Sequence, residues 1–280
     1  MMVRTVSKVR TSEQLADDLM RLGVETGDVV MVHASLRAIG PVEGRAAGVV
    51  TALDIAVGDE GTLLMMVSAR DDWSWVNERP EAERAELLAG SPLFDPLTAE
   101  SDPEVGVLAE IFRRTPGTSV SDHPEGRFAA RGRLAEAFTA DVPWDDYYGP
   151  GSPLERLVDS GGKVLRLGAD LDTVTLIHFA EYLADVPDKR RARRHRLVMS
   201  PAEGAVVRTV DCLDDSDGIV DHPGPDYFAV ILDDYLAARD GTDVVRRGQV
   251  GGARSELLDA ADLVAFATAW MTDHFRAIRA

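Results

Sequence analysis

The chain has 280 residues, of which 45% are hydrophobic, and its formal net charge at pH 7 is −18. This length and composition suffice for one large α/β domain or two small ones. The negative charge disfavours nucleic acid and anionic membranes as partners, because binding to phosphates requires a basic surface, and it favours a polycationic small molecule. Acidity that serves solubility alone is the alternative.

The single cysteine, Cys212, excludes an intrachain disulfide framework and a thiolate zinc site, so we expect a reducing compartment. Residues 1–10 carry charges but no apolar core, unlike a signal peptide. No segment approaches the ~20 apolar residues of a membrane-spanning helix. We therefore predict a cytoplasmic protein that does not bind membranes.

The N-terminal part of the chain predicts a β-α-β unit. An amphipathic helix over Ser12–Gly23 precedes an apolar strand over Asp28–Val32 and a polar loop over His33–Gly40. A helix over Ala46–Val57 and a buried strand over Gly61–Val67 complete the unit. Near-continuous apolar strands are typical of a sheet covered on both faces, so the polar loop at the strand end is a candidate binding segment.

After the second strand, paired acids stand beside tryptophan at Asp71, Asp72 and Trp73. This combination favours recognition of a cationic ligand through charge and ring faces. A surface turn with a core-anchoring tryptophan remains the alternative. The following elements are predicted as helices over 80–89 and 104–114, a strand over 128–132, a turn-rich aromatic loop over 144–153 and a short helix over 154–159 capped by Ser152.

The segment from Gly161 to Glu181 combines a strand with a candidate proton-transfer pair. The apolar run Gly161–Gly168 predicts a strand and a tight turn, followed by a helix capped by Asp172 or Thr173. On such a helix, His178 lies on the second turn and shares a face with Glu181, because residues three apart are neighbours. A satisfied structural histidine is the alternative interpretation.

The C-terminal part contains a basic run over 188–196 in an otherwise acidic chain. It is typical of a solvated edge, and it could also hold the phosphates of a nucleotide cofactor. Next come a strand over 206–213, a turn over 214–218, a helix over 227–238, an extended segment over 248–258 and a helix over 260–278. No repeat or linker divides the chain, so we predict a single domain over residues 1–280.

Most catalytic signatures are missing from the sequence. Four histidines could converge on a metal, but His178-x-x-Glu181 has no second pair of the kind that helical metal sites need. There is no serine-nucleophile elbow, phosphate-binding P-loop or dinucleotide fingerprint. Removal of a proton from an amine by His178 remains, with Glu181, Asp172 or Asp221 holding its other ring nitrogen.

Five blocks resemble the aminoglycoside 3-N-acetyltransferase family and occur in the family's order over nearly the whole chain. A further segment, Asp214–Asp221, is similar to a variable part of the family. The pyrophosphate loop of the larger N-acetyltransferase superfamily is absent, because its nearest approaches both end in valine. The five blocks are Val30–Gly40, Gly61–Leu63, Ser121–Glu125, Tyr148–Leu154 and Leu167–Glu181.

The resemblance implies an α/β fold with a central mixed sheet flanked by helices, distinct from that superfamily. It also implies acetyl-CoA as the donor, the 3-amino group of a 2-deoxystreptamine aminoglycoside as the acceptor and antibiotic resistance as the outcome, and the missing metal-ligand patterns lead us to expect no metal. An acetyltransferase of the same fold for a biosynthetic amine and a non-catalytic aminoglycoside-binding protein are the alternatives. The aminoglycoside spectrum and the oligomeric state stay open, with a homodimer among the options.

Residue roles follow from the same resemblance. It assigns the general base to His178 and its carboxylate partner to Glu181 or Asp221. Direct attack on the thioester also needs an oxyanion donor, for which we expect a backbone N–H near Ser35 or Ser121. We expect the strand-end acids to concentrate a polycationic substrate. The CoA contacts are His33, Ser35, Leu36, Arg37, Ser121 and His123, and the substrate contacts are Asp71, Asp72, Trp73, Asp170 and Glu181.

Overall fold

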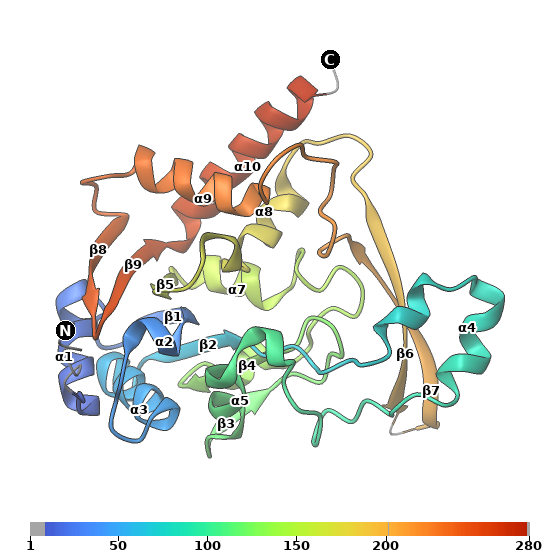
Figure 1. Cartoon of the computed structure of the whole chain (residues 1–280), viewed down its shortest axis with the longest axis horizontal. Coiled ribbons are helices and arrows are strands. Elements are labelled where there is room, and N and C mark those ends of the chain that lie inside the picture. The colour runs from blue at the N-terminus through green and yellow to red at the C-terminus, as the bar shows by residue number, and fades with distance from the viewer. Residues whose placement is uncertain (1–8, 201, 279–280) are drawn as a thin grey trace, which may run out of the picture.

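The computed structural model describes residues 9–200 and 202–278, so most of the N-terminal segment that was compared with a signal peptide lies outside the described residues. Figure 1 shows the elements. In chain order they are α1 (Ser12–Leu22), β1 (Val29–Ala34), α2 (Leu36–Ile39), α3 (Ala46–Val57), β2 (Thr62–Met66), η1 (Ser74–Glu78), α4 (Glu81–Leu88), η2 (Pro103–Val105), α5 (Val107–Arg114), β3 (Thr118–Val120), β4 (Phe128–Gly132), α6 (Ala135–Thr139), α7 (Pro153–Asp159), β5 (Lys163–Leu167), η3 (Leu171–Thr173), α8 (Ile177–Leu183), β6 (Arg191–Ser200), β7 (Gly204–Leu213), α9 (Tyr227–Ala238), β8 (Val245–Val250), β9 (Ala253–Asp259) and α10 (Ala260–Ile278).

A seven-stranded sheet with the order β3-β4-β2-β1-β5-β9-β8 forms the centre of the fold. β1 runs parallel to β2 and β5, and the other neighbouring pairs are antiparallel. The sheet is therefore mixed, as the resemblance implied. β6 and β7 form a separate two-stranded ribbon beyond it, next to α4 (Figure 1).

Each face of the sheet carries its own hydrophobic core, because successive side chains of a strand point to opposite faces. In β1, Val29 and Met31 belong to the core that includes side chains of α7, α8, α9 and α10. Val30 and Val32 belong to the core that includes α1, α3 and α5. Cover on both faces explains why β1, β2 and β5 read as apolar runs.

The structure confirms most of the predicted helices and strands, and the bounds of α3, α9 and β4 agree with the prediction. The loop predicted over His33–Gly40 contains the four-residue helix α2, and α6 had no counterpart in the prediction. The extended segment predicted over 248–258 covers the turn of the β8–β9 hairpin. Helices of four or five residues bury too few side chains to leave a periodic pattern.

The segment after β5 differs from the prediction of one helix capped by Asp172 or Thr173. The chain forms the short helix η3, turns at Val174 and starts α8 only at Ile177, so His178 lies on the first turn. Val174, Leu176 and Ile177 are all fully buried. A single amphipathic helix could not bury three such closely spaced positions on one face, so the backbone turns between them.

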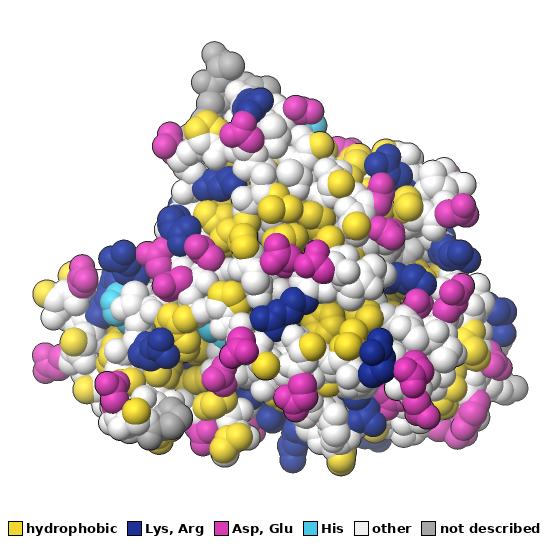
Figure 2. All heavy atoms as spheres, turned by 180° about the vertical axis from the view of Figure 1, so that it is seen from behind, with side chains coloured by type: hydrophobic (Ala, Val, Ile, Leu, Met, Phe, Trp, Pro, Cys, Tyr) yellow, Lys and Arg dark blue, Asp and Glu magenta, His cyan; other side chains and the backbone are white. Residues whose placement is uncertain are grey.

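The surface carries the net negative charge without a single acidic face in the view of Figure 2, where Asp and Glu lie among Lys, Arg and apolar side chains. Within residues 9–200 and 202–278, no helix is both long and apolar enough to cross a membrane.

Candidate active site

His178 and Glu181 form a buried pair on α8, beyond the carboxyl end of β5. Nδ1 of His178 lies 2.7 Å from Oε2 of Glu181, and only 1% of the Glu181 side chain is exposed. The other oxygen of Glu181, Oε1, accepts a hydrogen bond from the hydroxyl of Tyr227. One ring nitrogen of His178 therefore bonds to the Glu181 carboxylate, and both oxygens of that carboxylate have a hydrogen-bond partner.

Two aromatic rings fix the plane of the His178 imidazole. Tyr148 stacks on it with ring centroids 4.8 Å apart and an interplanar angle of 10°. Phe228, at the start of α9, contacts it edge-on at 4.6 Å. The imidazole can thus neither tilt nor rotate freely, and the ring edge that carries Nε2 keeps a defined direction.

Burial lowers the pKa of His178, but the Glu181 carboxylate, helped by Asp215 and Asp226, outweighs burial and raises the pKa above its usual value. Glu181 holds the proton of the neutral ring on Nδ1, which leaves the lone pair on Nε2. Among the described residues, no hydrogen bond involves Nε2 of His178, whereas 17% of the side chain is exposed. The imidazole is therefore built to accept a proton from a ligand.

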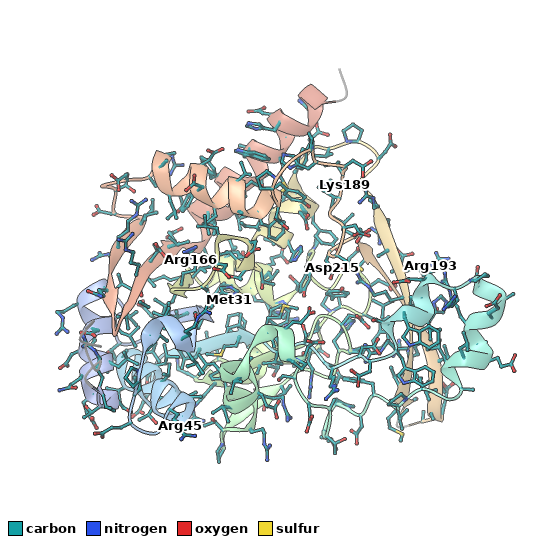
Figure 3. The ribbon with its side chains drawn as sticks, in the orientation of Figure 1. Met31, Arg45, Arg166, Lys189, Arg193 and Asp215 are labelled. Carbon is teal, nitrogen blue, oxygen red and sulfur yellow. The ribbon has the colours of Figure 1, made fainter. Side chains whose placement is uncertain are left out.

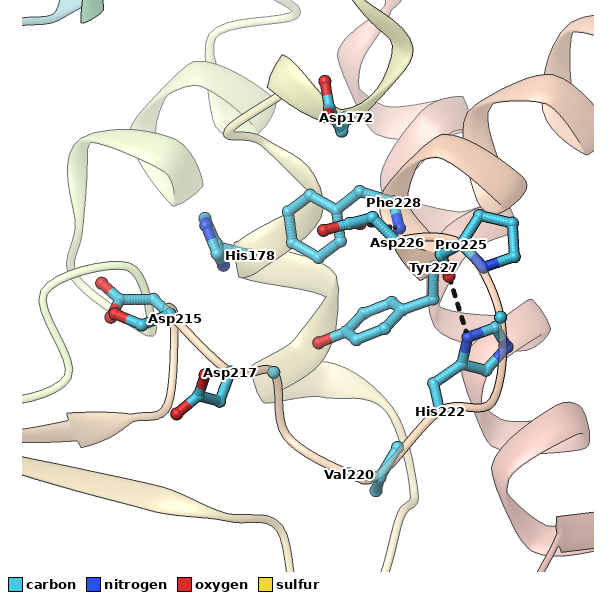
Figure 4. A pocket seen from close by; sticks show the side chains of 13 residues that line it. Asp172, His178, Asp215, Asp217, Val220, His222, Pro225, Asp226, Tyr227 and Phe228 are labelled. Carbon is cyan, nitrogen blue, oxygen red and sulfur yellow. Dashed lines mark hydrogen bonds between the residues drawn. The ribbon is translucent and has the colours of Figure 1, made fainter. Parts of the chain in front are cut away.

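His178 lies where two acid-lined pockets meet. The α9 pocket has a volume of about 230 Å³, and Figure 4 shows His178 and Asp215 across it from Phe228 and Asp226. The ribbon pocket, of about 390 Å³, lies on the other side of His178. Both pockets contain His178, Asp215 and Ser216; the α9 pocket adds Asp172, Asp217 and Asp226, and the ribbon pocket adds Asp71, Asp102, Glu104 and Glu125.

Two arginines of β6 lie among the acidic residues that line the ribbon pocket. Arg194 pairs with Asp215, which also accepts a hydrogen bond of 2.5 Å from the hydroxyl of Tyr147. Arg196 pairs with Asp71 at 2.9 Å and Glu125 at 3.0 Å, and 9% of its side chain is exposed. Figure 3 shows Asp215 between the sheet and the ribbon.

The basic run is a solvated edge on one strand face only, because Arg191 and Arg193 are 44% and 62% exposed while the arginines of the other face point inward. Arg194 and Arg196 alternate along β6, so they share one face of the strand and point at the pocket acids. The arginines of the opposite face, Arg191 and Arg193, pair with Asp211. Arg194 and Arg196 of the basic run thus neutralise part of the negative charge that lines the ribbon pocket.

A third pocket, the sheet-end pocket, lies at the ends of β1 and β2 and has a volume of about 400 Å³. It shares Met66, Glu104 and Val105 with the ribbon pocket, so the two spaces adjoin. His33, Ser35, Asp170 and Thr175 are among its lining residues. Burial, assisted by Arg166, lowers the pKa of His33 to about 4, so His33 is a neutral wall residue near pH 7.

The predicted CoA contacts separate into distinct places in the fold. His33 and Ser35 line the sheet-end pocket together, as the prediction required, but Leu36 is not among its lining residues. Arg37 points into another groove, between α1, α2 and the β8–β9 turn. The amide N–H groups of Ser35 and Ser121 themselves donate to the carbonyl oxygens of Leu167 and Phe128, so a backbone oxyanion donor near them would have to be a neighbouring amide.

Ser121 and His123 are structural residues, contrary to the prediction that they contact CoA. Each is 1% exposed. The Ser121 hydroxyl accepts from the Phe128 amide. His123 accepts from the Glu125 and Gly126 amides at Nδ1 and donates to the Trp144 carbonyl at Nε2. The hydrogen bonds of both side chains stabilise the loop that carries Glu125, which lines the ribbon pocket.

The structure also separates the predicted carboxylates. Asp221 is not the partner of His178, because its side chain is 98% exposed and pairs with Arg190. Glu181 is too buried, and its oxygens too fully used, to bind a substrate ammonium group. Asp71 lines the ribbon pocket, Asp170 lines the sheet-end pocket, and neither Asp72 nor Trp73 lines either pocket beside His178.

Sequence reasoning missed the side chains that surround the pair from distant segments, namely Tyr148, Asp215, Tyr227 and Phe228. Asp215 lies in the acidic segment that resembles the family, and the period-two spacing of Arg194 and Arg196 is a readable signal for one strand face. Tyr227 and Phe228 carry no local signal. Within the described residues, no group of three or more His, Cys, Asp or Glu side chains is arranged to hold a metal ion.

Comparison with known proteins gives a consistent result. The aminoglycoside 3-N-acetyltransferase family model matches residues 31–272. Aminoglycoside N(3)-acetyltransferase VII of Streptomyces paromomycinus is 42% identical over 273 residues, which cover 94% of this chain and 92% of that protein. The structure of AAC-IIIb in binary complex with CoASH has a TM-score of 0.88 at 39% identity and covers 96% of this chain and 98% of its own. Sisomicin-bound AAC-VIa has a TM-score of 0.85 at 37% identity and covers 95% and 99%, respectively.

Proposed function

This chain belongs to the aminoglycoside 3-N-acetyltransferase family, and we propose that it acetylates the 3-amino group of a 2-deoxystreptamine aminoglycoside with His178 as the general base. Acetyl-CoA is the proposed donor, and antibiotic resistance is the proposed consequence. The observation that carries the proposal is the His178–Glu181 pair at the junction of two acid-lined pockets. The CoA and sisomicin complexes of similar proteins support the same pair of substrates.

The proposed role of His178 follows from the charge of the acceptor. An aminoglycoside amine is protonated near pH 7, and the surrounding carboxylates stabilise that form, so a base must remove a proton before the nitrogen can attack. Nε2 of His178 is the available lone pair, and Glu181 stabilises the imidazolium that results. His178 then gives this proton to the departing CoA thiolate as the new C–N bond forms and the C–S bond breaks, and the neutral imidazole takes the second proton of the attacking nitrogen, which passes to solvent.

The two pockets beside His178 offer different charge to a cationic substrate. In the ribbon pocket, Arg196 pairs with Asp71 and Glu125, so the local excess of negative charge is reduced. Of the ribbon-pocket acids, only Asp102 and Glu104 have no salt-bridge partner among the described residues. In the α9 pocket, Asp172, Asp217 and Asp226 have none, and no Lys or Arg is among the described lining residues. We expect the ring with more ammonium groups to enter the α9 pocket, because opposite charges attract most strongly where a cation does not already compensate them.

Acetyl-CoA has a candidate site in the sheet-end pocket, which adjoins the ribbon pocket next to Met66. His33 and Ser35 line this space, and Nε2 of His33 is buried without a hydrogen-bond partner in the described structure, which suits a polar ligand atom there. The Thr175 hydroxyl lies in the same pocket, 3.7 Å from the Met66 sulfur. We propose this hydroxyl as the donor to the thioester oxygen, beside the backbone N–H near Ser35 or Ser121 expected from the sequence.

His178→Ala tests this proposal directly. The variant should lose about 10²- to 10⁴-fold in turnover, the loss expected for a missing general base, while its affinity for CoA remains nearly unchanged. Thiol release from acetyl-CoA with gentamicin or kanamycin measures turnover, and calorimetry measures CoA binding. His274→Ala, which removes an imidazole from α10, is the matched control and should behave like the wild type.

The same assay separates the alternatives. CoA release with an aminoglycoside supports the proposal, whereas release only with another amine would indicate a biosynthetic acetyltransferase. Drug binding without release would indicate a sequestering protein. Near-normal turnover by His178→Ala would remove His178 from the mechanism whatever the substrate.

A further inference from the structure

Tyr227 connects three parts of the site through a single hydroxyl group. It lies at the start of α9, donates to Oε1 of Glu181 on α8, and accepts from the amide of Ile219 in the loop 214–226 at 3.2 Å. The residue is 6% exposed, and its ring packs edge-on against Phe228 and Phe275. In Figure 4 the hydroxyl points towards the helix that carries His178.

The loop approaches Tyr227 closely because of Gly218. A Cβ atom at this position would lie 2.7 Å from Cε1 and 3.0 Å from the hydroxyl oxygen of Tyr227. The φ angle of Gly218 is +78°, a conformation that favours glycine. The loop that carries Asp215 and Asp217 is therefore packed directly onto Tyr227.

We propose that Tyr227 is a positioning residue for the acetyl transfer: its hydroxyl holds Glu181 in the rotamer that orients His178 and ties the acidic loop to that arrangement. The proposal rests on the proposed function, in which His178 is the base. Tyr227 acts through Glu181 and does not itself touch a reacting atom. No other described side chain donates to Oε1 of Glu181.

The electrostatic consequence has a definite sign. Glu181 is almost completely buried and has one partner on each oxygen. If the donor at Oε1 is removed, negative charge concentrates on Oε2, which stabilises the His178 imidazolium and raises its pKa further. Other charged or titratable groups also surround the pair: Tyr148 stacks on the imidazole and Lys189 lies beside Glu181. The remaining ones line the two pockets that contain His178, namely Asp172, Asp215, Asp217, His222 and Asp226 in the α9 pocket and Asp71, Asp102, Glu104, Glu125, Tyr147, Arg194 and Arg196 in the ribbon pocket.

Tyr227→Phe removes only the hydroxyl and keeps the packed ring. We expect kcat to fall about 10- to 100-fold, the range of one hydrogen bond to a charged group, with KM for the aminoglycoside changed far less. The acid limb of the kcat/KM profile should move to higher pH by about half a unit or more. Tyr235→Phe is the matched control, because Tyr235 is a buried tyrosine of the same helix whose hydroxyl lies beside Asp262 and not beside Glu181.

NMR titration of the His178 ring gives a readout that does not depend on activity. Tyr227→Phe should raise the pH at which His178 titrates, and 3-fluorotyrosine at position 227, a stronger donor with nearly the same shape, should lower it. If the phenylalanine variant does not fold, the fluorotyrosine protein still decides the question. Equal titration in all three proteins, with kcat of Tyr227→Phe within twofold of Tyr235→Phe, would overturn the proposal. Failure of the base mechanism would appear separately, as full activity of His178→Ala.

Discussion

His178 and His123 occupy closely similar surroundings and have opposite properties. Each lies between two aromatic rings, Tyr148 and Phe228 for the half-buried His178, and Trp144 and Tyr147 for the fully buried His123. The pKa of His178 is raised, because the effect of Glu181 exceeds that of burial. The pKa of His123 is lowered to about 4, because burial dominates and its partners are uncharged backbone groups.

The comparison shows what makes a buried histidine a candidate base. Aromatic packing is common to both sites, so it does not distinguish them. His178 has a carboxylate on one nitrogen and a pocket at the other, whereas both nitrogens of His123 are bonded to the backbone. Substitutions of the carboxylate partner Glu181, of the buried His123 and of the stacking ring Tyr148 should therefore have separate effects.

Glu181→Gln should cause the largest effect, because it removes the charge that distinguishes the two histidines. We expect kcat to fall by about 10² or more, as when a triad carboxylate becomes an amide. The pKa of His178 should also fall, since burial then acts without its main opposing influence, and the acid limb of the kcat/KM profile should move to lower pH.

Asp221→Asn is the matched control for Glu181→Gln, because both replace a carboxylate that the sequence offered as partner of His178. Asp221 is exposed and paired with Arg190, so activity should stay within about twofold of the wild type. Equal losses in the two variants, measured by thiol release across pH, would contradict the assignment of Glu181.

The sequence could predict the pair but not its surroundings, for physical reasons visible in these residues. The spacing of His178 and Glu181 is local, and one helical turn brings them together even though α8 starts later than predicted. Tyr227 reaches Glu181 from 46 residues away, through packing that no local pattern encodes. Nδ1 of His123 bonds to backbone amides of its own turn, so the side chain could be predicted from the sequence as a CoA contact and yet be buried in the fold.

The apolar strands were predictable because their burial leaves a local pattern in the sequence. β1, β2 and β5 are covered on both faces, which requires apolar residues at nearly every position. Arg194 and Arg196 lie on a strand whose faces differ, and only pairing with β7 and the approach of Asp71, Glu125 and Asp215 reveals which face is buried.

His123→Ala should affect stability and leave the chemistry in place. It leaves two backbone amides without their acceptor and opens a cavity, so the free energy of unfolding should fall by about 2–4 kcal/mol. Urea unfolding measures the change. Asp122→Ala, at an exposed neighbouring position, is the control and should change it by about 0.5 kcal/mol or less.

The pH dependence of stability gives the same variant a second readout. The folded pKa of His123, about 4, lies below the unfolded value of about 6.5, so the unfolded chain takes up a proton first as the pH falls. Stability should therefore decrease from pH 6.5 towards pH 4, with His33 adding a decrease of the same sign. His123→Ala should flatten this decrease, and an unchanged slope would show that His123 is not held neutral.

Tyr148→Phe should have the smallest effect, because it keeps the ring that stacks on His178 and removes only the hydroxyl. The variant tests whether that hydroxyl takes part in the chemistry. The Tyr148 hydroxyl contacts only the sulfur of Met66, at 3.2 Å, among the described residues, and burial raises its pKa well above the usual value. The phenylalanine ring keeps the stacking on His178, so kcat/KM should stay within about twofold and its acid limb should not move, since a hydrogen bond to a thioether is weak. Tyr148→Ala, which removes the ring, should lower turnover by leaving the imidazole free to tilt. A tenfold loss in Tyr148→Phe would instead make the phenol a participant in proton transfer, and the difference between the two histidines would then depend on their rings as well as on their hydrogen-bond partners.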